Sequence, residues 1–198
     1  MFEDLKAEGG LSEKHSLMVG LAIEECKRMQ DLIRSLRHIS RPSTMSLKKI
    51  KPNLLVQNSL LFHKNLFSSH KVTLKKSLEE DLPEIIVVED QITQVFFNLI
   101  NNAVAAMFDS GGVLTVATAK TVKNVTISFQ DSGQGMNKEN MRHIFEPFFS
   151  TKPESEGTGL GLYISYNIIK NHGGNIEVSS TLLQGTTFVV SIPRPDGM

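Results

Sequence analysis

The sequence of 198 residues has little of what several protein classes require. It contains one cysteine, Cys26, so no disulfide forms within the chain, which fits a reducing compartment. Lys plus Arg and Asp plus Glu number 21 each, so no basic excess favours nucleic acid or an anionic membrane as a main partner. No apolar run reaches the roughly 18–20 residues of a membrane-spanning helix, and residues 1–10 do not resemble a secretory signal. We therefore expect a cytoplasmic chain, which can still belong to a larger, membrane-anchored protein.

A long helix is predicted over residues 12–40, where apolar residues alternate in steps of three and four. His15 and Glu25 interrupt this seam, and Val19 and Ile23 widen the apolar face toward that of a bundle helix. Pro42 ends the pattern. Such a helix needs a partner helix to cover its apolar face, and another subunit can supply one.

The remainder of the chain alternates between short strands and helices. Helices are predicted over residues 52–65, 90–107, 137–145 and 160–172, and strands over residues 46–50, 71–78, 84–88, 113–122, 125–131, 175–181 and 185–193. In the strand predicted over residues 84–88, the last four residues are continuously apolar, which predicts a more buried strand than the alternating one over residues 71–78. Tight turns join the last four strands into two antiparallel hairpins. The pattern predicts an α+β fold, a two-layer α/β sandwich with a mixed, mostly antiparallel sheet. We divide the chain into residues 1–42 and a second domain over residues 43–198.

The helix over residues 90–107 is unusually rich in amides. Gln91, Gln94, Asn98, Asn101 and Asn102 form a polar stripe on an otherwise apolar helix. An uncharged amide oxygen suits a hard cation such as Mg²⁺, which proteins usually hold through few ligands plus phosphate. The alternative is a set of structural amides that bond to nearby loops, and this alternative is favoured for Asn101.

Three loops contain residues suited to a nucleotide. Residues 131–135 (D-S-G-Q-G) follow a strand and either form a simple turn or place a carboxylate where a base amino group can donate to it. Residues 156–162 (E-G-T-G-L-G-L) run into a helix, whose N-terminal N–H groups suit phosphate. They match neither the Walker pattern nor the dinucleotide fingerprint, and Gly161, costly within a helix, argues against a merely flexible loop. Residues 145–149 (F-E-P-F-F) are either core or the hinge of a lid, and Lys152 lies within reach of a phosphate.

These segments, together and in this order, resemble the N, G, F and second G boxes of sensor histidine kinases. Those kinases share a superfamily with DNA gyrase B, mismatch-repair ATPases and heat-shock chaperone ATPases. The similarity covers about residues 46–193 and is greatest to the nitrogen-regulation-like branch. Residues 32–43 resemble the end of the second helix of the kinase dimerisation hairpin. The resemblance implies a Bergerat-type ATP-binding fold, with ATP and Mg²⁺ as cofactors.

Carried over position by position, the resemblance assigns Asn102 to Mg²⁺ and Asp131 to the adenine amino group. Gly133 and Gly135 then line the base pocket, and Thr186 supports the adenine through its hydroxyl or a water. The implied lid spans residues 146–158. The remaining implied contacts are to phosphate, through the Lys152 side chain and through the backbone of Gly157, Thr158, Gly159, Leu160 and Gly161.

The implied catalytic set is Asn98, Asn102 and Lys152. Hydrolysing members of the superfamily have a glutamate at the position of Asn98, where it activates water. An amide cannot take up a proton at neutral pH, so Asn98 favours a kinase over a hydrolase. Many histidine kinases have Lys or Arg where this chain has Ala105, so one phosphate contact is missing or Lys152 supplies it.

No histidine of the chain has the sequence of a phosphate acceptor, because none precedes an acidic or amide residue. His15 lies in the predicted second helix of the hairpin. His172 precedes a Gly-Gly helix stop, where a cation suits the helix dipole. The acceptor helix is therefore apparently absent from this chain.

The function expected from the resemblance is that of the ATP-binding catalytic domain of a two-component sensor histidine kinase. The intact protein would transfer the γ-phosphate of ATP to a histidine, and from there to an aspartate on the receiver domain of a response regulator. It would dimerise through the N-terminal helix and meet a membrane only through a sensor region outside this chain. We expect this chain to bind ATP without phosphorylating itself. Two alternatives stay open, an ATP-hydrolysing conformational switch and a non-catalytic, nucleotide-sensing interaction module.

Overall fold

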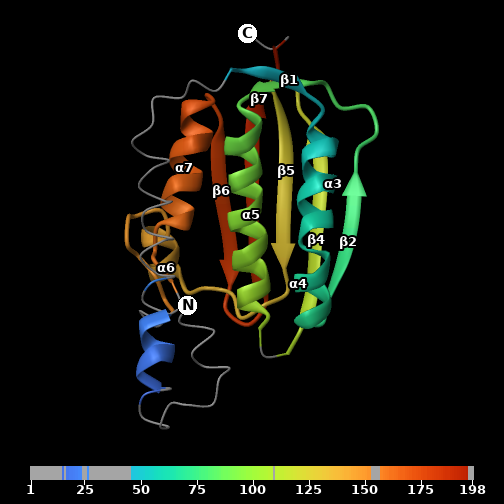
Figure 1. The fold of residues 1–198 in the computed structure, drawn as a ribbon. Coiled ribbons are helices and arrows are strands. Elements are labelled where there is room, and N and C mark those ends of the chain that lie inside the picture. Colours follow the sequence, from blue (N-terminus) through green and yellow to red (C-terminus); the bar gives the residue numbers. More distant parts are fainter. Residues whose placement is uncertain are drawn as a thin grey trace.

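The computed structural model describes residues 15, 17–23, 26, 46–108, 110–152 and 157–195 (Figure 1). Residues 15, 17–23 and 26 are helical, as predicted, and among them Leu17, Met18 and Leu21 are exposed. The rest of the predicted helix over residues 12–40 and the domain boundary at residue 42 lie outside the described residues. The division into two domains therefore stays a prediction.

A five-stranded mixed sheet forms one layer of the molecule. Its strands follow the order β2-β4-β5-β7-β6, in which β2 and β4 are parallel and every other neighbouring pair is antiparallel. The bounds are Val72–Leu78 (β2), Gly112–Lys120 (β4), Asn124–Asp131 (β5), Asn175–Thr181 (β6) and Gly185–Pro193 (β7). The predicted mixed, mostly antiparallel sheet and both predicted hairpins are confirmed.

A separate two-stranded ribbon pairs β1 (Lys48–Ile50) with β3 (Ile85–Val87) in antiparallel register. The prediction that this strand is the more buried one agrees with Ile85 and Val87, which are fully buried, whereas Ile86 between them is 40% exposed. A ribbon of this kind buries one face, so alternate side chains of even an all-apolar strand point to solvent.

The second layer is helical. Helices α3 (Pro52–Phe62), α5 (Glu89–Ala106) and α7 (Gly161–Asn171) lie over the same face of the sheet (Figure 1). The two short helices are α4 (Lys64–Ser69) and α6 (Lys138–His143). The single helix predicted over residues 52–65 is instead two helices that meet at His63, whose Nδ1 lies 2.7 Å from the carbonyl oxygen of Ser59. The predicted two-layer sandwich is confirmed.

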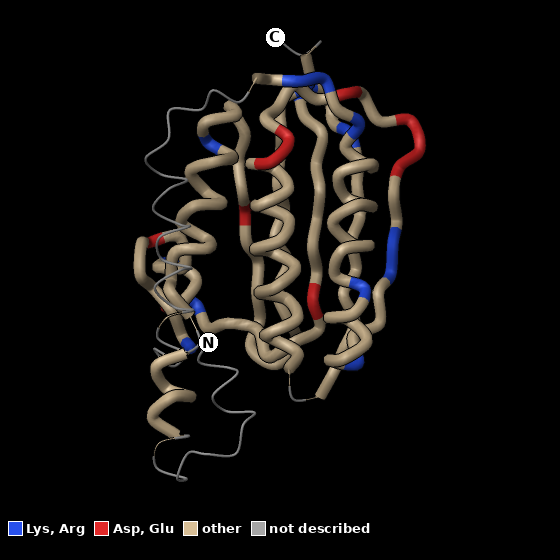
Figure 2. The backbone as a smooth tube through the Cα atoms, in the orientation of Figure 1, with Lys and Arg blue, Asp and Glu red and all other residues tan. Residues whose placement is uncertain are grey.

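Helix α5 is the central helix of this layer, and its apolar side fills the core against the sheet. Its buried residues are Ile92, Val95, Phe96, Leu99, Ile100, Ala103 and Val104. Its only charged residues are Glu89 and Asp90 in the first turn, where negative charge suits the helix dipole (Figure 2). The amide side is therefore uncharged over the following four turns. None of the helices in the described ranges combines the length and hydropathy that a bilayer crossing needs.

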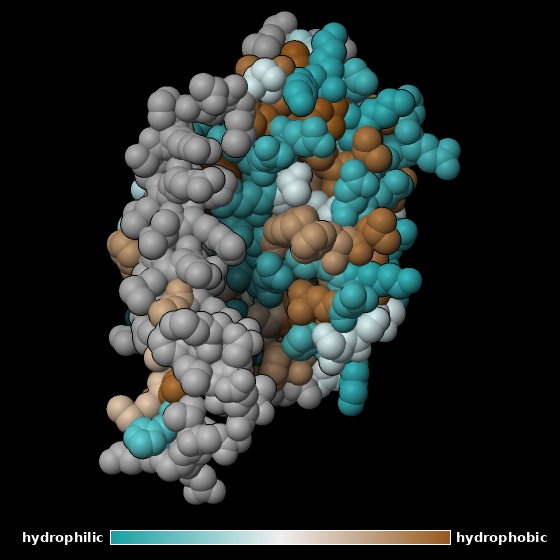
Figure 3. All heavy atoms as spheres, in the orientation of Figure 1, coloured by the Kyte–Doolittle hydropathy of each residue, from teal (hydrophilic) through white to brown (hydrophobic). Residues whose placement is uncertain are grey.

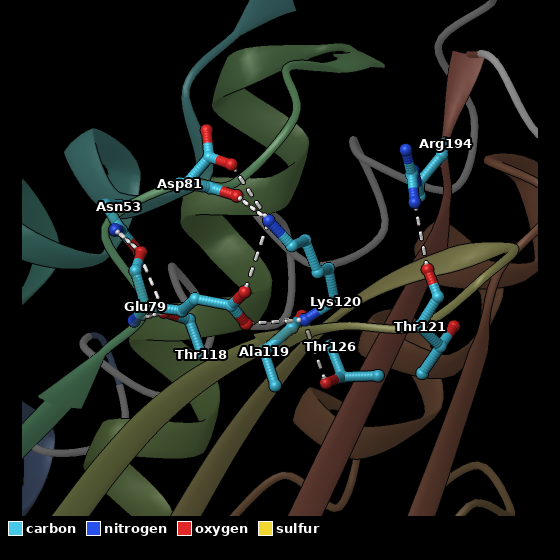
Figure 4. A network of polar contacts seen from close by, with 9 residues as sticks. All are labelled: Asn53, Glu79, Asp81, Thr118, Ala119, Lys120, Thr121, Thr126 and Arg194. Carbon is cyan, nitrogen blue, oxygen red and sulfur yellow. Dashed lines mark hydrogen bonds and ion pairs between the residues drawn. The ribbon is translucent and has the colours of Figure 1, made fainter.

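A polar network joins α3 to the sheet at the end of β2 and β4 (Figure 4). The buried Thr118 hydroxyl donates to Asn53 Oδ1 and accepts from the backbone N–H of Glu79 at 3.0 Å. Lys120 Nζ donates to Asp81 Oδ2 at 3.0 Å and lies 3.4 Å from Glu79 Oε1. Because Asn53 belongs to α3 and Thr118 to β4, their hydrogen bond anchors α3 on the sheet.

Candidate functional site

The predicted site segments come together along α5. At the C-terminal end of the helix, Gly133 packs against the carbonyl group of Ala106. Further toward the N-terminus, Asn98 contacts Gly161 in the first turn of α7. Hydrophilic atoms line a hollow beside α5 in the space-filling view, whereas apolar atoms gather on the side of α3 (Figure 3). Segments more than 60 positions apart in the chain thus border one polar strip.

Asp131 is the last residue of β5 and is only 4% exposed. Its Oδ1 accepts hydrogen bonds from the backbone N–H of Gly133 at 2.9 Å and of Thr186 at 3.2 Å. Within the described ranges, Oδ2 accepts no hydrogen bond. Burial raises the pKa of this carboxyl above 3.8, and the two N–H donors partly offset that effect by favouring the charged form. The side chain is therefore fixed through one oxygen and presents the other as an acceptor.

The loop after Asp131 lies so close to its neighbours that it has no room for side chains at its glycines. A Cβ at Gly133 would lie 2.5 Å from the carbonyl oxygen of Ala106, and one at Gly135 would lie 2.0 Å from that of Thr181. Gly135 also has a φ of +64°, which favours glycine. The sequence assigned both glycines to a close approach of a base ring, and that assignment stays a prediction. The close approaches seen here are to carbonyl groups of the protein itself.

Ser180 on β6 supports this end of the site and was not predicted. Its hydroxyl accepts from the backbone N–H of Met136 at 2.8 Å and donates to the carbonyl of Gly185 at 2.9 Å. It also lies 3.0 Å from the hydroxyl of the buried Thr186, its cross-strand partner. The only signal in the sequence is the hairpin register, which places residue 180 opposite the predicted residue 186.

The three asparagines of α5 have different surroundings. The side chain of Asn98 donates to the carbonyl of Gly161 at 3.1 Å and to the Ser165 hydroxyl at 3.2 Å. Asn102 is half-buried, and its amide has no hydrogen-bond partner in the part of the chain that the structure describes. Asn101 is exposed and likewise makes no such bond there, so the structural role favoured for Asn101 is not observed.

The glycine-rich loop leads into α7, and its backbone contacts Thr158 within the loop and Phe148 outside it. Leu160, the residue before the first helical turn, is buried, and its N–H donates to the Thr158 hydroxyl at 3.4 Å. Gly159 has a φ of +65°, and a Cβ there would lie 2.3 Å from the backbone of Phe148. The two ends of the predicted lid over residues 146–158 are therefore in contact. Residues 153–156 of that lid lie outside the described residues.

Two of the three phenylalanines over residues 145–149 pack against the core, as the core alternative predicts, and the role of this segment as the hinge of a lid stays a prediction. The ring of Phe145 is tilted by 36° against that of Tyr166 of α7, with 5.3 Å between the ring centroids, and Phe149 packs against the core. Phe148 is 69% exposed with a φ of +67°, so it departs from the cluster and carries backbone strain. Lys152 is exposed, and its Cβ lies 3.6 Å from the position that a Cβ at Gly157 would take.

His172 corrects the expectation of a cation at the end of α7. The backbone N–H of Val88 donates to its Nε2 at 3.0 Å, and its Nδ1 lies 2.8 Å from the carbonyl of Ile168. Because Nε2 accepts a hydrogen bond, it carries no proton, and because a carbonyl oxygen only accepts, Nδ1 carries one, so the imidazole is neutral. The ring thereby ties the end of α7 to the residue that precedes α5.

No group of three or more His, Cys, Asp or Glu side chains suited to a metal occurs among the described residues. A metal at this site would therefore depend on amide oxygens and on oxygens of its ligand. The half-buried, unpartnered amide of Asn102 fits such a donor set, because Mg²⁺ prefers oxygen and commonly keeps phosphate and water ligands.

Comparison with known proteins agrees with this arrangement. Residues 87–196 match the family model described as histidine kinase-, DNA gyrase B- and HSP90-like ATPase. The chain is 34% identical over 192 residues to the sensor histidine kinase ZraS of Escherichia coli strain K12, a match that covers 97% of this chain and 40% of that protein. The chain thus spans less than half the length of this curated relative.

Two solved structures share the fold. The nucleotide-free catalytic domain of the histidine kinase ThkA superimposes with a TM-score of 0.69 at 27% identity, covering 78% of this chain and all of that domain. The structure of ThkA in complex with the response regulator TrrA gives a TM-score of 0.75 at 22% identity, covering 96% of this chain and 55% of that chain. At 22% identity, the second similarity is one of fold.

Proposed function

Because this chain belongs to the histidine kinase-, DNA gyrase B- and HSP90-like ATPase family, as the catalytic ATP-binding domain of a two-component sensor histidine kinase, we propose that it binds ATP with Mg²⁺ along α5 and offers the γ-phosphate to a histidine. The observation that supports this most is the packing of two loops on one helix. Gly133 lies on Ala106 at the end of α5, and Gly161 lies against Asn98 of the same helix. A base site and a phosphate site thus share one wall.

The adenine would bind at the Asp131 end of this wall. Its amino group donates to Asp131 Oδ2, the oxygen that Gly133 and Thr186 leave available. Gly133 and Gly135 let the neighbouring loop pack closely on Ala106 and Thr181, and this packed loop would line the base pocket. Thr186 supports this side through its hydroxyl, which Ser180 holds in place.

The phosphates would bind at the start of α7. The first turn of a helix offers N–H groups without intrahelical partners and the positive end of the dipole. These N–H groups belong to Gly161 and the two residues after it, and the loop over residues 157–160 adds further backbone donors. Lys152 supplies positive charge from the lid. Asn102 would hold Mg²⁺ through its amide oxygen, and the ion when bound neutralises charge on the phosphate oxygens.

The reaction would be transfer to a protein rather than to water. Asn98 uses its amide N–H groups on Gly161 and Ser165, and an amide takes no proton at neutral pH. No side chain at this position therefore activates a water against the γ-phosphate. Bound ATP persists until an acceptor nitrogen arrives, which attacks the γ-phosphorus while the bond to the β-phosphate oxygen breaks and ADP leaves.

The acceptor and the next partner are proposed for the intact protein. A histidine on a hairpin helix would take the phosphoryl group, and a receiver-domain aspartate of a response regulator would take it next, as suggested by the complex known for ThkA. Residues 1–42 would form the second helix of that hairpin and dimerise, and residues 43–198 would form the catalytic domain.

The test is nucleotide binding by the wild-type chain. Titration calorimetry with ATP and with ADP, each with and without Mg²⁺, is expected to give one site per chain with tighter binding when Mg²⁺ is present. Guanosine triphosphate serves as the control, because its ring has a carbonyl where adenine has the amino group that Asp131 accepts. Absence of ATP binding, or equal affinity for both triphosphates, would refute the proposal.

A further inference from the structure

We infer that Asn98 and Ser165 are positioning residues that hold the phosphate-binding turn of α7 at a set distance from the magnesium asparagine of α5. The inference rests on the proposed function and assigns a role to Ser165, which no sequence motif singles out. It also changes the role of Asn98 from a missing glutamate to a clamp between two helices.

The contact is a triangle of hydrogen bonds between the helices. Asn98 Nδ2 lies 3.1 Å from the carbonyl oxygen of Gly161 and 3.2 Å from Ser165 Oγ. The Ser165 hydroxyl in turn donates to the same Gly161 carbonyl at 2.9 Å. Since a carbonyl oxygen only accepts, the atom of Asn98 that faces it must be the amide nitrogen. The orientation of the amide thus follows from its partners, and Oδ1 faces away from the carbonyl.

Ser165 has the properties of a residue retained for this contact. It is fully buried, with an exposed fraction of 0%, in the middle of α7. A serine that bonds back to the carbonyl four residues earlier gives a helix no net stability, since it competes with the helical hydrogen bond. Its lone pair, however, accepts from Asn98, so the side chain is satisfied only while the two helices are in contact.

The clamp lies where it controls the geometry of the site. Asn98 is one helical turn before Asn102 on α5, and Gly161 is the first residue of α7. A shift of α7 along α5 would therefore change the distance between the amide oxygen that holds Mg²⁺ and the N–H groups that hold phosphate. Adenine contacts at Asp131 belong to β5 and would not change.

The same contact opposes an acidic residue at position 98. An aspartate there would place a carboxylate oxygen against the Gly161 carbonyl, so an attractive hydrogen bond would become a contact between two acceptors. With α7 in this position, the packing therefore favours a donor over an aspartate at position 98.

The experiment compares Ser165→Ala with Ser59→Ala, a matched change at a serine that is 1% exposed on α3 and has no hydrogen-bond partner for its hydroxyl. Affinities are measured for adenosine and for ADP with Mg²⁺. Loss of one hydrogen bond is expected to weaken ADP binding by about threefold to tenfold in Ser165→Ala, with adenosine affinity unchanged. Ser59→Ala is expected to leave both affinities at the wild-type value.

Three further variants complete the test, which are Ser165→Cys, Asn98→Ala and the double variant Asn98→Ala/Ser165→Ala. Ser165→Cys keeps nearly the same side-chain volume but offers a weaker donor and acceptor, so a smaller loss of ADP affinity than in Ser165→Ala is expected. This variant provides the test if the alanine variant folds poorly. In the double variant Asn98→Ala/Ser165→Ala, the loss is expected to be smaller than the two single losses combined, because both changes break one triangle.

The outcomes separate this inference from the proposed function. If the wild-type chain binds ADP but Ser165→Ala and Ser165→Cys behave like Ser59→Ala, or weaken adenosine and ADP equally, the clamp is refuted and the nucleotide site stands. If the wild-type chain binds no ADP at all, the proposed function is refuted, and the clamp as a positioning device with it.

Discussion

At the scale of single residues, the site depends on Asp131. This carboxylate is buried, and its charge is held by two backbone N–H groups on the same oxygen, Oδ1. An uncompensated buried charge is costly, and the unoccupied acceptor Oδ2 is what a donor on a ligand would satisfy. A donor on a ligand at Oδ2 would therefore complete the hydrogen bonding of this carboxylate.

Replacing Asp131 by asparagine is expected to separate binding from stability. The amide oxygen can still accept from Gly133 and Thr186, but the amide nitrogen then meets the adenine amino group, donor against donor. Loss of a charge-assisted hydrogen bond predicts at least about tenfold weaker ADP binding, measured by calorimetry at pH 7. The exposed Asp81→Asn is the control and should bind normally. Unchanged affinity in the Asp131 variant would contradict the assigned base contact.

The pH dependence of stability provides a second test at this residue. The pKa of Asp131 in the folded chain lies above its ordinary 3.8 because of burial, so the folded state binds the proton more tightly than the unfolded state. The free energy of unfolding contributed by this group is thus highest at low pH and falls as pH rises through the folded pKa. The Asp131→Asn variant has no carboxyl group at this position, so its free energy of unfolding does not decrease in this way as pH rises. Urea unfolding from pH 7 down to pH 4 is expected to show the advantage of the variant over wild type shrinking as pH falls. An advantage that stays constant with pH would contradict the assigned shift.

At the scale of elements, glycines allow loops to pack closely on their neighbours, and single side chains join helices through hydrogen bonds. Gly135 allows the loop after β5 to lie on the end of β6, and Gly159 allows the loop before α7 to lie on Phe148. His172 ties the end of α7 to the start of α5, and Asn98 ties the start of α7 to the middle of α5. The helices α5 and α7 run antiparallel, and these contacts at the two ends of α7 fix their relative position.

Two glycine substitutions distinguish backbone conformation from close approach. Both Gly135 and Gly173 have positive φ, at +64° and +70°, but a Cβ at Gly173 meets only Pro193 Cγ at 3.6 Å. Gly173→Ala is expected to lower the free energy of unfolding by about 1–2 kcal/mol, the cost of a left-handed residue. Gly135→Ala should cost more, since its Cβ would lie 2.0 Å from the Thr181 carbonyl. Urea unfolding measures both, and equal losses would show that the close approach relaxes without cost.

His172→Ala tests the link between α7 and α5. The Val88 N–H would lose its acceptor, which predicts a loss of about 1–3 kcal/mol in the free energy of unfolding and faster hydrogen exchange at the Val88 amide. His70→Ala is the control, because His70 also lies within 3.0 Å of a carbonyl four residues earlier but accepts no backbone N–H from another element. Unchanged exchange at Val88 in the His172 variant would contradict the assigned neutral ring.

At the scale of the whole molecule, the chain has a nucleotide site, but its described residues include no histidine with the sequence of a phosphoryl acceptor. His63 and His172 already bond to backbone groups of their own or a neighbouring helix. None of the six histidines is followed by an acidic or amide residue.

The chain is therefore expected to bind ATP without forming phosphohistidine. Incubation with ATP labelled on the γ-phosphate, followed by separation in alkaline gel, should leave the chain unlabelled. A sensor kinase with its complete hairpin serves as the positive control, and the Asp131→Asn variant as the negative one. Acid-labile, base-stable label on the wild-type chain that is missing from the Asp131 variant would contradict this prediction.

The sequence by itself determined the elements and the composition of the site. Alternation along residues 113–131 and 175–193 produces two hairpins, because period-two patterns can bury only one face. The apolar side of α5 predicted that this helix packs in the core. The order of the segments that resemble the kinase boxes predicted a nucleotide as the ligand. The assignment of Asp131, Gly133 and Gly135 to the base end of the site stays a prediction, and the structure shows that Asp131 Oδ1 accepts from the N–H of Gly133 in this segment.

Only the tertiary structure decided what the polar groups do. Asn98 and Gly161 are 63 positions apart, and Val88 and His172 are 84 apart, so no local pattern reports which atom of either side chain donates. The roles of Asn98, Ser165 and Ser180, and the neutral state of His172, follow from hydrogen bonds across packed elements. Hydrogen-bond direction is set by the partner that packing supplies, and packing between distant segments is not encoded at any one position of the chain.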